Sequence, residues 1–245
     1  MTTGLDVLSG TTTLSGANTF SGGVTLTGGT LKVSSDSNLG AASNSLVFDG
    51  GTLESADTFT TNRAVTLNTA AGNFNVDSGK TLTVGGVIDD GAGSYAVNKS
   101  GAGTLVLTKV NTYDGGTTVT GGTLNVNSDG ALGNTAGGLT LDGGTLQWGS
   151  GFNSARSITL TALGGTFDSN TYNVILTGGI TGSGELNKQG TGILTLSGAN
   201  TYTGDTVVNG GTLKTSGTGT LGSNSGAVSR GSRGNRGSGC RPSPA

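Results

Sequence analysis

The sequence predicts an all-β fold, a single-stranded parallel β-helix (β-solenoid) with about 20–22 residues per coil. Two nested repeats and a strand-like alternation of apolar and polar residues predict it, and no stretch shows a helical period long enough to compete. Each coil offers only a few apolar residues, so the core becomes continuous only when neighbouring coils stack. We expect a rod on the order of 50 Å long, from roughly ten coils spaced ~4.8 Å apart.

A long repeat organises the chain. The motif Asn-Thr-Phe/Tyr begins at Asn18, Asn111 and Asn200, so its spacing is 93 and then 89 residues. The spacing changes between Gly86 and Lys99, where the second copy has lost four residues. The β-helix is therefore predicted over 1–228, as long repeats 14–106 and 107–195 and a partial repeat 196–228.

A shorter repeat lies inside the long one. The tetrapeptide Gly-Gly-Thr-Leu at 28–31 returns at 50–53, and its copies stand 21 or 22 residues apart within each long repeat. Apolar-polar-apolar triplets surround it, and this alternation is typical of short strands. Gly, Asn, Asp and Ser between the triplets suit sharp corners. The triplets include Val24–Leu26, Val65–Leu67, Leu82–Val84, Leu139–Leu141, Ile158–Leu160 and Leu194–Leu196.

The alternation also assigns the faces of the strands, because side chains two residues apart share a face. Trp148 follows Leu146 by two residues, so we expect it in the core, with an exposed binding anchor as the alternative. The predicted inward residues are Leu31, Val33, Leu124, Val126 and Leu213, and the predicted outward ones are Lys32, Asn125 and Lys214.

The composition fits a thin rod and excludes several classes of protein. Glycine accounts for 50 of 245 residues, charged residues for 11% and aromatic residues for 4%. Without histidine, and with Cys240 as the single cysteine, the chain lacks the commonest metal ligand, the commonest general base and any internal disulfide. No apolar run is long enough for a membrane-spanning helix, and Met1 to Gly10 lack the basic start and apolar stretch of a secretion signal.

One block has a specific resemblance. The stretch from Lys188 to Gly204, followed by Gly-Gly-Thr-Leu, closely resembles the autotransporter-associated β-strand repeat, and a second copy begins at Lys99. The first copy departs from the pattern, with Phe20 for tyrosine and no Lys-Gly-x-Gly lead-in. The resemblance implies a right-handed β-helical passenger of a bacterial surface or secreted protein, often an adhesin, in which such repeats form the stalk. It also implies a membrane barrel or another anchor elsewhere in the family; these strands are too short to insert into a membrane themselves.

The repeat ends abruptly near the C-terminus. From Ser229 the sequence turns into an Arg/Gly/Ser/Pro tail that contains both prolines and Cys240. We expect residues 229–245 to be disordered. We also expect this tail to be either translated out of frame or an addition to the natural chain. The alternative is a basic tail for nucleic acid or anionic surfaces.

Several short motifs are weak as functional signals. Gly217–Gly222 matches a dinucleotide fingerprint by letter but lacks the strand, helix and acidic residue that the site requires, and Gly79-Lys80-Thr81 lacks the first glycine of a phosphate-binding loop. Asp89 and Asp90 offer calcium few of the six to eight oxygens that it prefers, so we expect a solvated corner there.

The carboxylates do not form a convincing catalytic pair. Glycoside hydrolysis needs two carboxyl groups across one site, but the two glutamates, Glu54 and Glu185, lie far apart in the sequence. Asp49 and Asp142 occupy equivalent Asp-Gly-Gly corners, as expected of turn residues. We expect no catalytic, cofactor-binding or metal-binding residues, no cofactor and no enzymatic activity.

Two repeated surface features remain open to a binding interpretation. The Asn-Thr-Tyr/Phe motif is a candidate sugar-binding surface, but we favour Asn closing a corner through its own backbone and the aromatic residue covering a coil edge. Repeated threonines are a candidate ice-binding face. The outward positions mix threonine with other residues, and this argues against that interpretation. The aromatic residues are Phe20, Tyr113 and Tyr202, and the mixed residues are Lys32, Glu54, Asn125 and Gln147.

The sequence as a whole favours a non-enzymatic structural segment of a secreted or surface-displayed passenger, a stalk in adhesion or surface display. A carbohydrate-directed β-helix is the alternative. We expect self-association through uncapped coil ends, a host-surface or glycan ligand as a further partner, no nucleic acid and no membrane insertion. The family resemblance places the chain outside the cell or at the bacterial surface.

Overall fold

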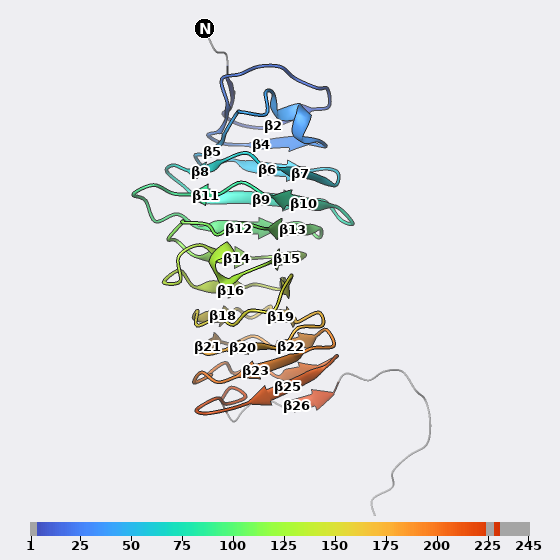
Figure 1. Ribbon diagram of the computed structural model, residues 1–245, viewed down its shortest axis with the longest axis vertical. Coiled ribbons are helices and arrows are strands. Elements are labelled where there is room, and N and C mark those ends of the chain that lie inside the picture. Colours follow the sequence, from blue (N-terminus) through green and yellow to red (C-terminus); the bar gives the residue numbers. More distant parts are fainter. Residues whose placement is uncertain (1–3, 224–227, 231–245) are drawn as a thin grey trace, which may run out of the picture.

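The computed structural model describes residues 4–223 and 228–230 and is a rod of stacked coils, with the N-terminal coil at one end (Figure 1). Every pairing between strands is parallel, and each strand pairs with the equivalent strand of the next coil. The strands are two to five residues long. The predicted all-β solenoid is confirmed.

Three strands, one on each side of the coil, make a typical turn of the rod. The first sheet contains β1 (Leu5–Val7), β3 (Val24–Leu26), β5 (Leu46–Phe48), β8 (Val65–Leu67) and β11 (Ile88–Asp89). The second sheet contains β2 (Thr11–Leu14), β4 (Thr30–Val33), β6 (Thr52–Ser55), β9 (Gly72–Val76), β12 (Val97–Ser100), β14 (Thr117–Val119), β16 (Leu139–Leu141), β18 (Ile158–Leu160) and β21 (Ile180–Gly182).

The third sheet begins later along the rod and continues to its C-terminal end. It contains β7 (Phe59–Thr61), β10 (Thr81–Val84), β13 (Thr104–Leu107), β15 (Thr123–Val126), β17 (Thr145–Trp148), β19 (Gly165–Asp168), β22 (Leu186–Gln189), β24 (Thr206–Val208) and β26 (Val228–Arg230). A fourth sheet lies near the C-terminal end of the rod, and each of its strands follows a strand of the third sheet along the chain. In the N-terminal coils this side of the rod is occupied by the first sheet. The fourth sheet contains β20 (Val174–Leu176), β23 (Ile193–Leu196) and β25 (Thr212–Thr215).

Two short 3₁₀ helices interrupt the strands. They are η1 (Asp36–Leu39) and η2 (Asp129–Leu132), and each lies in a loop where the coil has no strand on one side. Both are followed by a glycine with positive φ, Gly40 at 75° and Gly133 at 77°. An added Cβ at either glycine would collide with the backbone of the preceding coil, so the close approach requires glycine.

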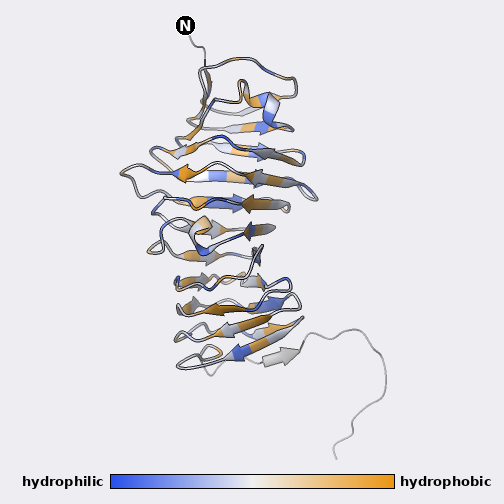
Figure 2. Ribbon diagram, in the orientation of Figure 1, coloured by the Kyte–Doolittle hydropathy of each residue, from blue (hydrophilic) through white to orange (hydrophobic). Residues whose placement is uncertain are grey.

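The core is a continuous apolar column inside the rod. Apolar and polar residues alternate along the strands, as the colours of Figure 2 show, and the apolar ones point inward. Leu31, Val33, Leu124 and Val126 are buried as predicted, while Leu213 near the C-terminal end is only partly buried. Each fully buried side chain of this size contributes about 1.5–3 kcal/mol. Stacking coil on coil therefore supplies the stability that no single coil has.

The long repeat does not contain a whole number of coils. Strand β3 in the first sheet corresponds to β14 in the second sheet and to β24 in the third, at spacings of 93 and 89 residues. From β4 the second sheet runs through β6, β9 and β12 to β14, which is four coils, and β3 lies one side before β4. Each long repeat thus advances by four coils and one further side of the rod.

The predicted boundary before the tail lies close to the end of the described residues. β26 pairs with β24 and continues to Arg230, so backbone pairing extends two residues past Val228. The rest of the predicted tail, residues 231–245 with Cys240, lies outside the described residues. The division at 228 remains a prediction.

Candidate functional site: clamped corners and polar columns

The Asn-Thr-Tyr motif is buried between coils. Tyr113 is fully buried, and its hydroxyl lies 2.7 Å from the Oγ1 atom of Thr117. Asn111 Oδ1 accepts a hydrogen bond from the backbone N–H of Ile88, and its Nδ2 donates to the carbonyl oxygen of Ala131. Its side chain therefore joins the coil before to the coil after. The expectation that it closes a corner through its own backbone, with the aromatic ring covering a coil edge, is wrong.

The third copy of the motif follows the same plan, and the first copy departs from it. Tyr202 pairs with Thr206 at 2.7 Å, and Asn200 bridges two coils as Asn111 does. In the first copy Phe20 replaces tyrosine and is only partly buried. Asn18 donates to the carbonyl oxygen of Asn38 in the next coil and to that of Gly16 in its own corner, so the expected bond to nearby backbone occurs in this copy. Because both tyrosines are buried, neither belongs to an exposed sugar-binding surface.

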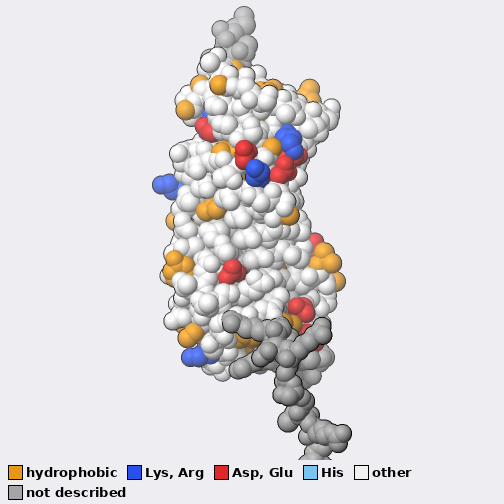
Figure 3. Space-filling view, turned by 90° about the vertical axis from the view of Figure 1, so that its right-hand side faces the viewer, with side chains coloured by type: hydrophobic (Ala, Val, Ile, Leu, Met, Phe, Trp, Pro, Cys, Tyr) orange, Lys and Arg blue, Asp and Glu red, His pale blue; other side chains and the backbone are white. Residues whose placement is uncertain are grey.

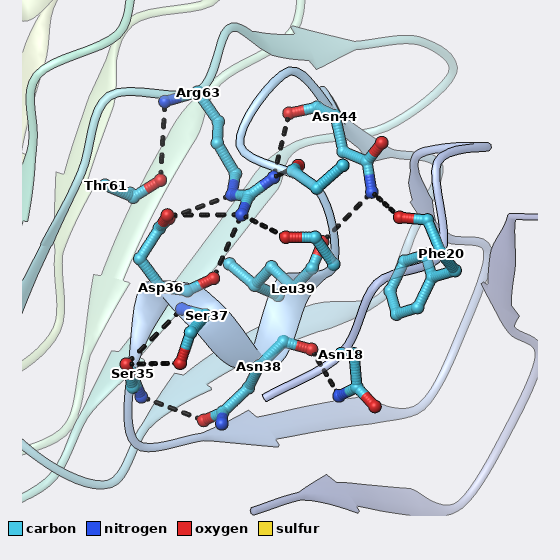
Figure 4. Close-up of polar contacts among 12 residues, drawn as sticks. Asn18, Phe20, Ser35, Asp36, Ser37, Asn38, Leu39, Asn44, Thr61 and Arg63 are labelled. Atoms are coloured by element: carbon cyan, nitrogen blue, oxygen red, sulfur yellow. Dashed lines mark hydrogen bonds and ion pairs between the residues drawn. The ribbon is translucent and has the colours of Figure 1, made fainter. Parts of the chain in front are cut away.

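The most extensive polar network in the first long repeat is built around Arg63 (Figure 4). Its side chain is 1% exposed, and Nε donates to the carboxylate of Asp36 at 2.8 Å. Its Nη atoms donate to the carbonyl oxygens of Asp36, Gly40, Ala41 and Asn44. The guanidinium lies one coil after the loop that contains η1, so it closes that loop from the neighbouring coil. Its rigid fork of five N–H groups suits this cluster of acceptors.

The same clamp occurs in the second long repeat. Arg156 is 1% exposed and donates from Nε to Asp129 at 3.1 Å. It also donates to the carbonyl oxygens of Asp129, Gly133, Asn134 and Gly137 in the loop that contains η2. Neither arginine was expected from the sequence to have this role. The available signal was their 93-residue spacing, which Asp36 and Asp129 share.

Two lysines are buried without a carboxylate bonded to them. Lys99 Nζ donates to the carbonyl oxygens of Ser100, Gly101 and Gly121 at 2.6, 2.8 and 3.2 Å. Burial lowers the pKa of Lys99 to about 8. The three carbonyls nevertheless give the ammonium one acceptor for each N–H, so it ties one corner to the corner of the next coil.

Lys188 occupies the same place one repeat later. It donates to the carbonyl oxygens of Gln189, Gly190 and Gly210, and burial lowers its pKa while the nearby Asp168 acts against the shift. In the first coil the equivalent residue is Val7, which pairs with Leu26 as Lys99 pairs with Val119. An apolar side chain therefore fits this inward position.

The predicted solvated corner at Asp89 and Asp90 is only half right. Asp89 is exposed, and its Oδ1 accepts from the hydroxyl of Thr112. Asp90 is 4% exposed, and its Oδ2 accepts from the backbone N–H groups of Tyr95 and Asp114, both at 2.9 Å. Within the described part of the chain, no three acidic or cysteine side chains are grouped closely enough to hold a metal ion.

The other acidic residues are spread along the rod. Asp49 and Asp142 accept hydrogen bonds from Thr69 and Thr161, each in the following coil, so these corner residues also link coils. Glu54 on β6 forms an ion pair with Lys32.

The two glutamates are too far apart to act on one bond. Glu185 follows β21, six coils after β6 along the second sheet, and Glu54 lies on β6 itself. At ~4.8 Å per coil this places them about 29 Å apart, whereas paired glycosidase carboxyls lie about 5–9.5 Å apart.

Trp148 is fully buried, as predicted, and its ring centroid lies 6.3 Å from that of Phe167. The motif at Gly217–Gly222 follows β25, and the structure describes no helix after it. Lys80, from the incomplete phosphate-loop match, forms an exposed ion pair with Asp57.

Outward threonines line up in columns on two sheets. The expectation that the outward positions mix threonine with other residues is confirmed, because the second-sheet column includes Asn73 and Asn98 and the neighbouring columns contain the four residues named above. The second-sheet column is Thr11, Thr30, Thr52, Asn73, Asn98, Thr118, Thr140, Thr159 and Thr181. The third-sheet column includes Thr81, Thr104, Thr123, Thr145 and Thr166.

Charged side chains are few, and some of them form ion pairs on the surface. Lys32 bonds both Glu54 and Asp77, and Lys80 bonds Asp57. On the face shown in Figure 3 the charged side chains gather towards the N-terminal end, and most of the remaining surface is uncharged. No helix in the described residues has the length and apolar character needed to cross a membrane.

Comparisons with known proteins agree with this architecture. The passenger-associated-transport-repeat family model matches residues 9–33, 97–126 and 186–214. The last two matches contain the buried lysine, the bridging asparagine and the buried tyrosine of their repeats. No solved structure matches the chain.

A curated relative is the adhesin BmaC autotransporter of Brucella suis biovar 1 (strain 1330). It is 39% identical over 202 aligned residues, and the match covers 74% of this chain and 6% of the adhesin. The chain thus spans a small part of that protein's length. The repeats and the solenoid that they build lead to one conclusion: the chain is an autotransporter passenger repeat protein.

Proposed function

We propose that this chain is a spacer segment of a secreted or surface-displayed passenger, a non-enzymatic β-helical stalk in adhesion or surface display. The observation that carries the proposal is the set of hydrogen-bond partners of the buried polar side chains. The buried arginines, lysines and asparagines bond from one coil to a neighbouring coil, and each buried tyrosine bonds a threonine four residues later in its own coil. Such contacts hold a rod together and leave these side chains unavailable for a ligand.

The relative supports the cellular setting of the proposal. The matched protein is named an adhesin and an autotransporter, and we infer from this a secreted or bacterial cell-surface location for the present chain. A stalk there holds binding regions away from the membrane, towards a host-surface or glycan ligand. Residues 1–228 act as the stalk in this proposal, and 229–245 lie outside it.

A glycan array combined with a polysaccharide-cleavage assay tests the proposal. The spacer function predicts neither saturable binding nor turnover for residues 1–228. Saturable binding of one glycan class, or release of reducing ends, would instead support a carbohydrate-directed β-helix. A variant carrying both Glu54→Gln and Glu185→Gln is the matched control, because turnover that survives it cannot depend on the glutamates.

The isolated segment is also expected to self-associate. β1 and β2 at one end, and β25 and β26 at the other, have a partner strand on one side only among the described residues. Exposed edges of parallel strands recruit further strands. Light scattering over a range of concentrations is expected to show a rising mean mass, whereas a constant monomer mass would contradict self-association.

A further inference from the structure

The loop at residues 218–223 is a third copy of the loops that contain η1 and η2. Its glycine, Gly222, has a φ of 74°, and an added Cβ there would lie 2.4 Å from the carbonyl oxygen of Tyr202. Gly133 in the second copy has a φ of 77° and the same 2.4 Å distance to Tyr113. The third loop therefore has the backbone shape of the clamped loops, although the structure describes no 3₁₀ helix in it.

Hydrogen bonds to the preceding coil hold this shape. The N–H of Ser223 donates to the carbonyl oxygen of Tyr202 at 2.9 Å, and Nδ2 of Asn200 donates to that of Thr220 at 2.8 Å. Both bonds have equivalents in the second long repeat, so the loop keeps its form where the arginine of the clamp is missing. The equivalents join Asn134 to Tyr113 and Asn111 to Ala131.

The third loop presents the acceptors of the clamp without a donor. In the second copy, Arg156 Nη2 donates to the carbonyl oxygens of Asp129 and Gly133 at 2.9 and 2.6 Å. The 89-residue spacing places Thr218 and Gly222 at these two positions. Among the described residues, no donor bonds either of these carbonyl oxygens. The loop is therefore shaped for a guanidinium group that none of the described coils supplies.

The same loop has apolar surface that is not covered. Leu39 and Leu132, in the two loops that an arginine closes, are 0% and 2% exposed. Leu221 stands at the equivalent position and is only partly buried. A segment that bonds the two free carbonyl oxygens would also lie close to this side chain.

The chain carries arginines directly after this loop and β26. We call residues 231–245 the terminal segment; it contains no acidic residue. In the first repeat the chain passes from the end of β5 at residue 48 to the clamp at residue 63, and β26 is the third-copy equivalent of β5. The terminal segment spans that same length after residue 230, so it is long enough to reach the loop. Its arginines are Arg233, Arg236 and Arg241.

We propose that the loop 218–223 is a guanidinium-binding site and that an arginine of the terminal segment occupies it. The Nη atoms donate to the carbonyl oxygens of Thr218 and Gly222, as the two clamp arginines do in their own loops. Because Thr218 replaces the aspartate, the contact is made to carbonyl oxygens alone and is weaker than either clamp. The site goes beyond the proposed spacer function and does not depend on it.

Hydrogen exchange of the full chain, followed by mass spectrometry, tests the proposal. Replacing all three arginines by glutamine is expected to speed exchange of the N–H groups of residues 218–223 by about threefold, the size expected for an exposed hydrogen bond to a charged group. The loop at residues 129–137, which Arg156 closes, is the internal control and is expected to exchange at an unchanged rate. The substitutions are Arg233→Gln, Arg236→Gln and Arg241→Gln.

Two further variants separate the guanidinium group from its charge. The same three arginines replaced by lysine keep the charge and lose the planar fork, so exchange is expected to match the glutamine variant. Slow exchange in the lysine variant would contradict a guanidinium-specific site. Thr218→Asp restores the missing carboxylate and is expected to slow exchange of the loop only when the terminal arginines are present.

Equal exchange rates in the unsubstituted chain and the glutamine variant would overturn the proposal. Protection that rises with protein concentration would also overturn it, because the arginine would then come from a second copy.

Energy transfer from Trp148 to a fluorescent label on Cys240 reports the position of the terminal segment, since these are the single tryptophan and the single cysteine. The glutamine variant is expected to show less transfer, and equal transfer would count against docking. These readouts involve no glycan binding or turnover, so they stand apart from the test of the spacer function.

Discussion

The two long repeats place the same clamp on different sides of the rod. Arg63 closes the loop of η1, and Arg156, 93 residues later, closes the loop of η2 with the same set of acceptors. Their surroundings differ because each long repeat advances by four coils and one further side. Equivalent residues of successive repeats therefore make the same contacts but lie on different sides of the rod. A repeat of this kind has no unique face, which suits a spacer better than a groove.

A third copy of the loop shows what the clamp needs. In the repeat spacing, Thr218 stands where Asp36 and Asp129 stand, and Ala245 falls at the place of the arginine. Residues 218–223 thus lack the acidic partner, and three of these six residues are exposed. The first two copies of the loop are thus closed by an Arg–Asp ion pair, and the third copy lacks both residues of that pair.

The largest expected effect is loss of a clamp. Arg63→Met and Arg156→Met each remove a buried guanidinium and leave several carbonyl oxygens without a donor, so each is expected to lower the free energy of unfolding by about 3–5 kcal/mol. Urea denaturation of the two variants measures this. A large effect from one variant and less than about 1 kcal/mol from the other would break the equivalence of the repeats.

The second expected effect is a rise in stability with pH. Burial lowers the pKa of Lys99 to about 8 and also lowers that of Lys188, whereas unfolded lysines titrate near 10.4. Between pH 8 and 10 the unfolded state binds more protons than the folded state, so the free energy of unfolding increases. Above pH 10 the trend reverses, because burial raises the pKa values of Tyr113 and Tyr202 while unfolded tyrosines ionise there.

Urea midpoints at pH 7, 8, 9, 10 and 11 check this profile. Lys99→Val, which copies Val7 of the first coil, is expected to flatten the rise between pH 8 and 10. A midpoint that falls over that interval in the unsubstituted protein would show that the buried lysines are not the groups that titrate.

A smaller effect is expected at the buried tyrosines. Tyr113→Phe and Tyr202→Phe leave the hydroxyls of Thr117 and Thr206 without their partners, at a cost of about 1–2 kcal/mol each. Phe20→Tyr, which adds a hydroxyl at the equivalent position of the first copy, is the control for these two substitutions. Chemical denaturation of the three variants measures the differences, and a cost below about 0.3 kcal/mol at both tyrosines would show that the hydrogen bond is dispensable.

The smallest effect is expected on the surface. Lys80 and Asp57 form an exposed ion pair, with side chains 39% and 56% exposed. Lys80→Ala is expected to change the free energy of unfolding by less than about 1 kcal/mol. Denaturation at low and high salt checks this, and a loss as large as that of Arg63→Met would remove the distinction between buried and exposed ion pairs.

Much of the fold was predictable because its signals are local. Alternation of apolar and polar residues decides which side of a strand faces the core, and it placed Leu31, Leu124 and Trp148 correctly. The recurrence of Gly-Gly-Thr-Leu gave the coil length. Neither signal concerns contacts between coils, and this is why the bridging role of Asn111 and the burial of Asp90 were missed.

The sequence by itself determined that the chain coils, how long each coil is and which side chains fill it, since these depend on period and side-chain chemistry. Only the tertiary structure decided that the long repeat turns by one side of the rod, because the number of sides that a repeat covers is set by the corners between strands. It also decided the roles of Arg63, Arg156, Lys99 and Lys188. Their partners are mostly backbone carbonyl oxygens, which every residue carries, so residue identity alone cannot reveal them.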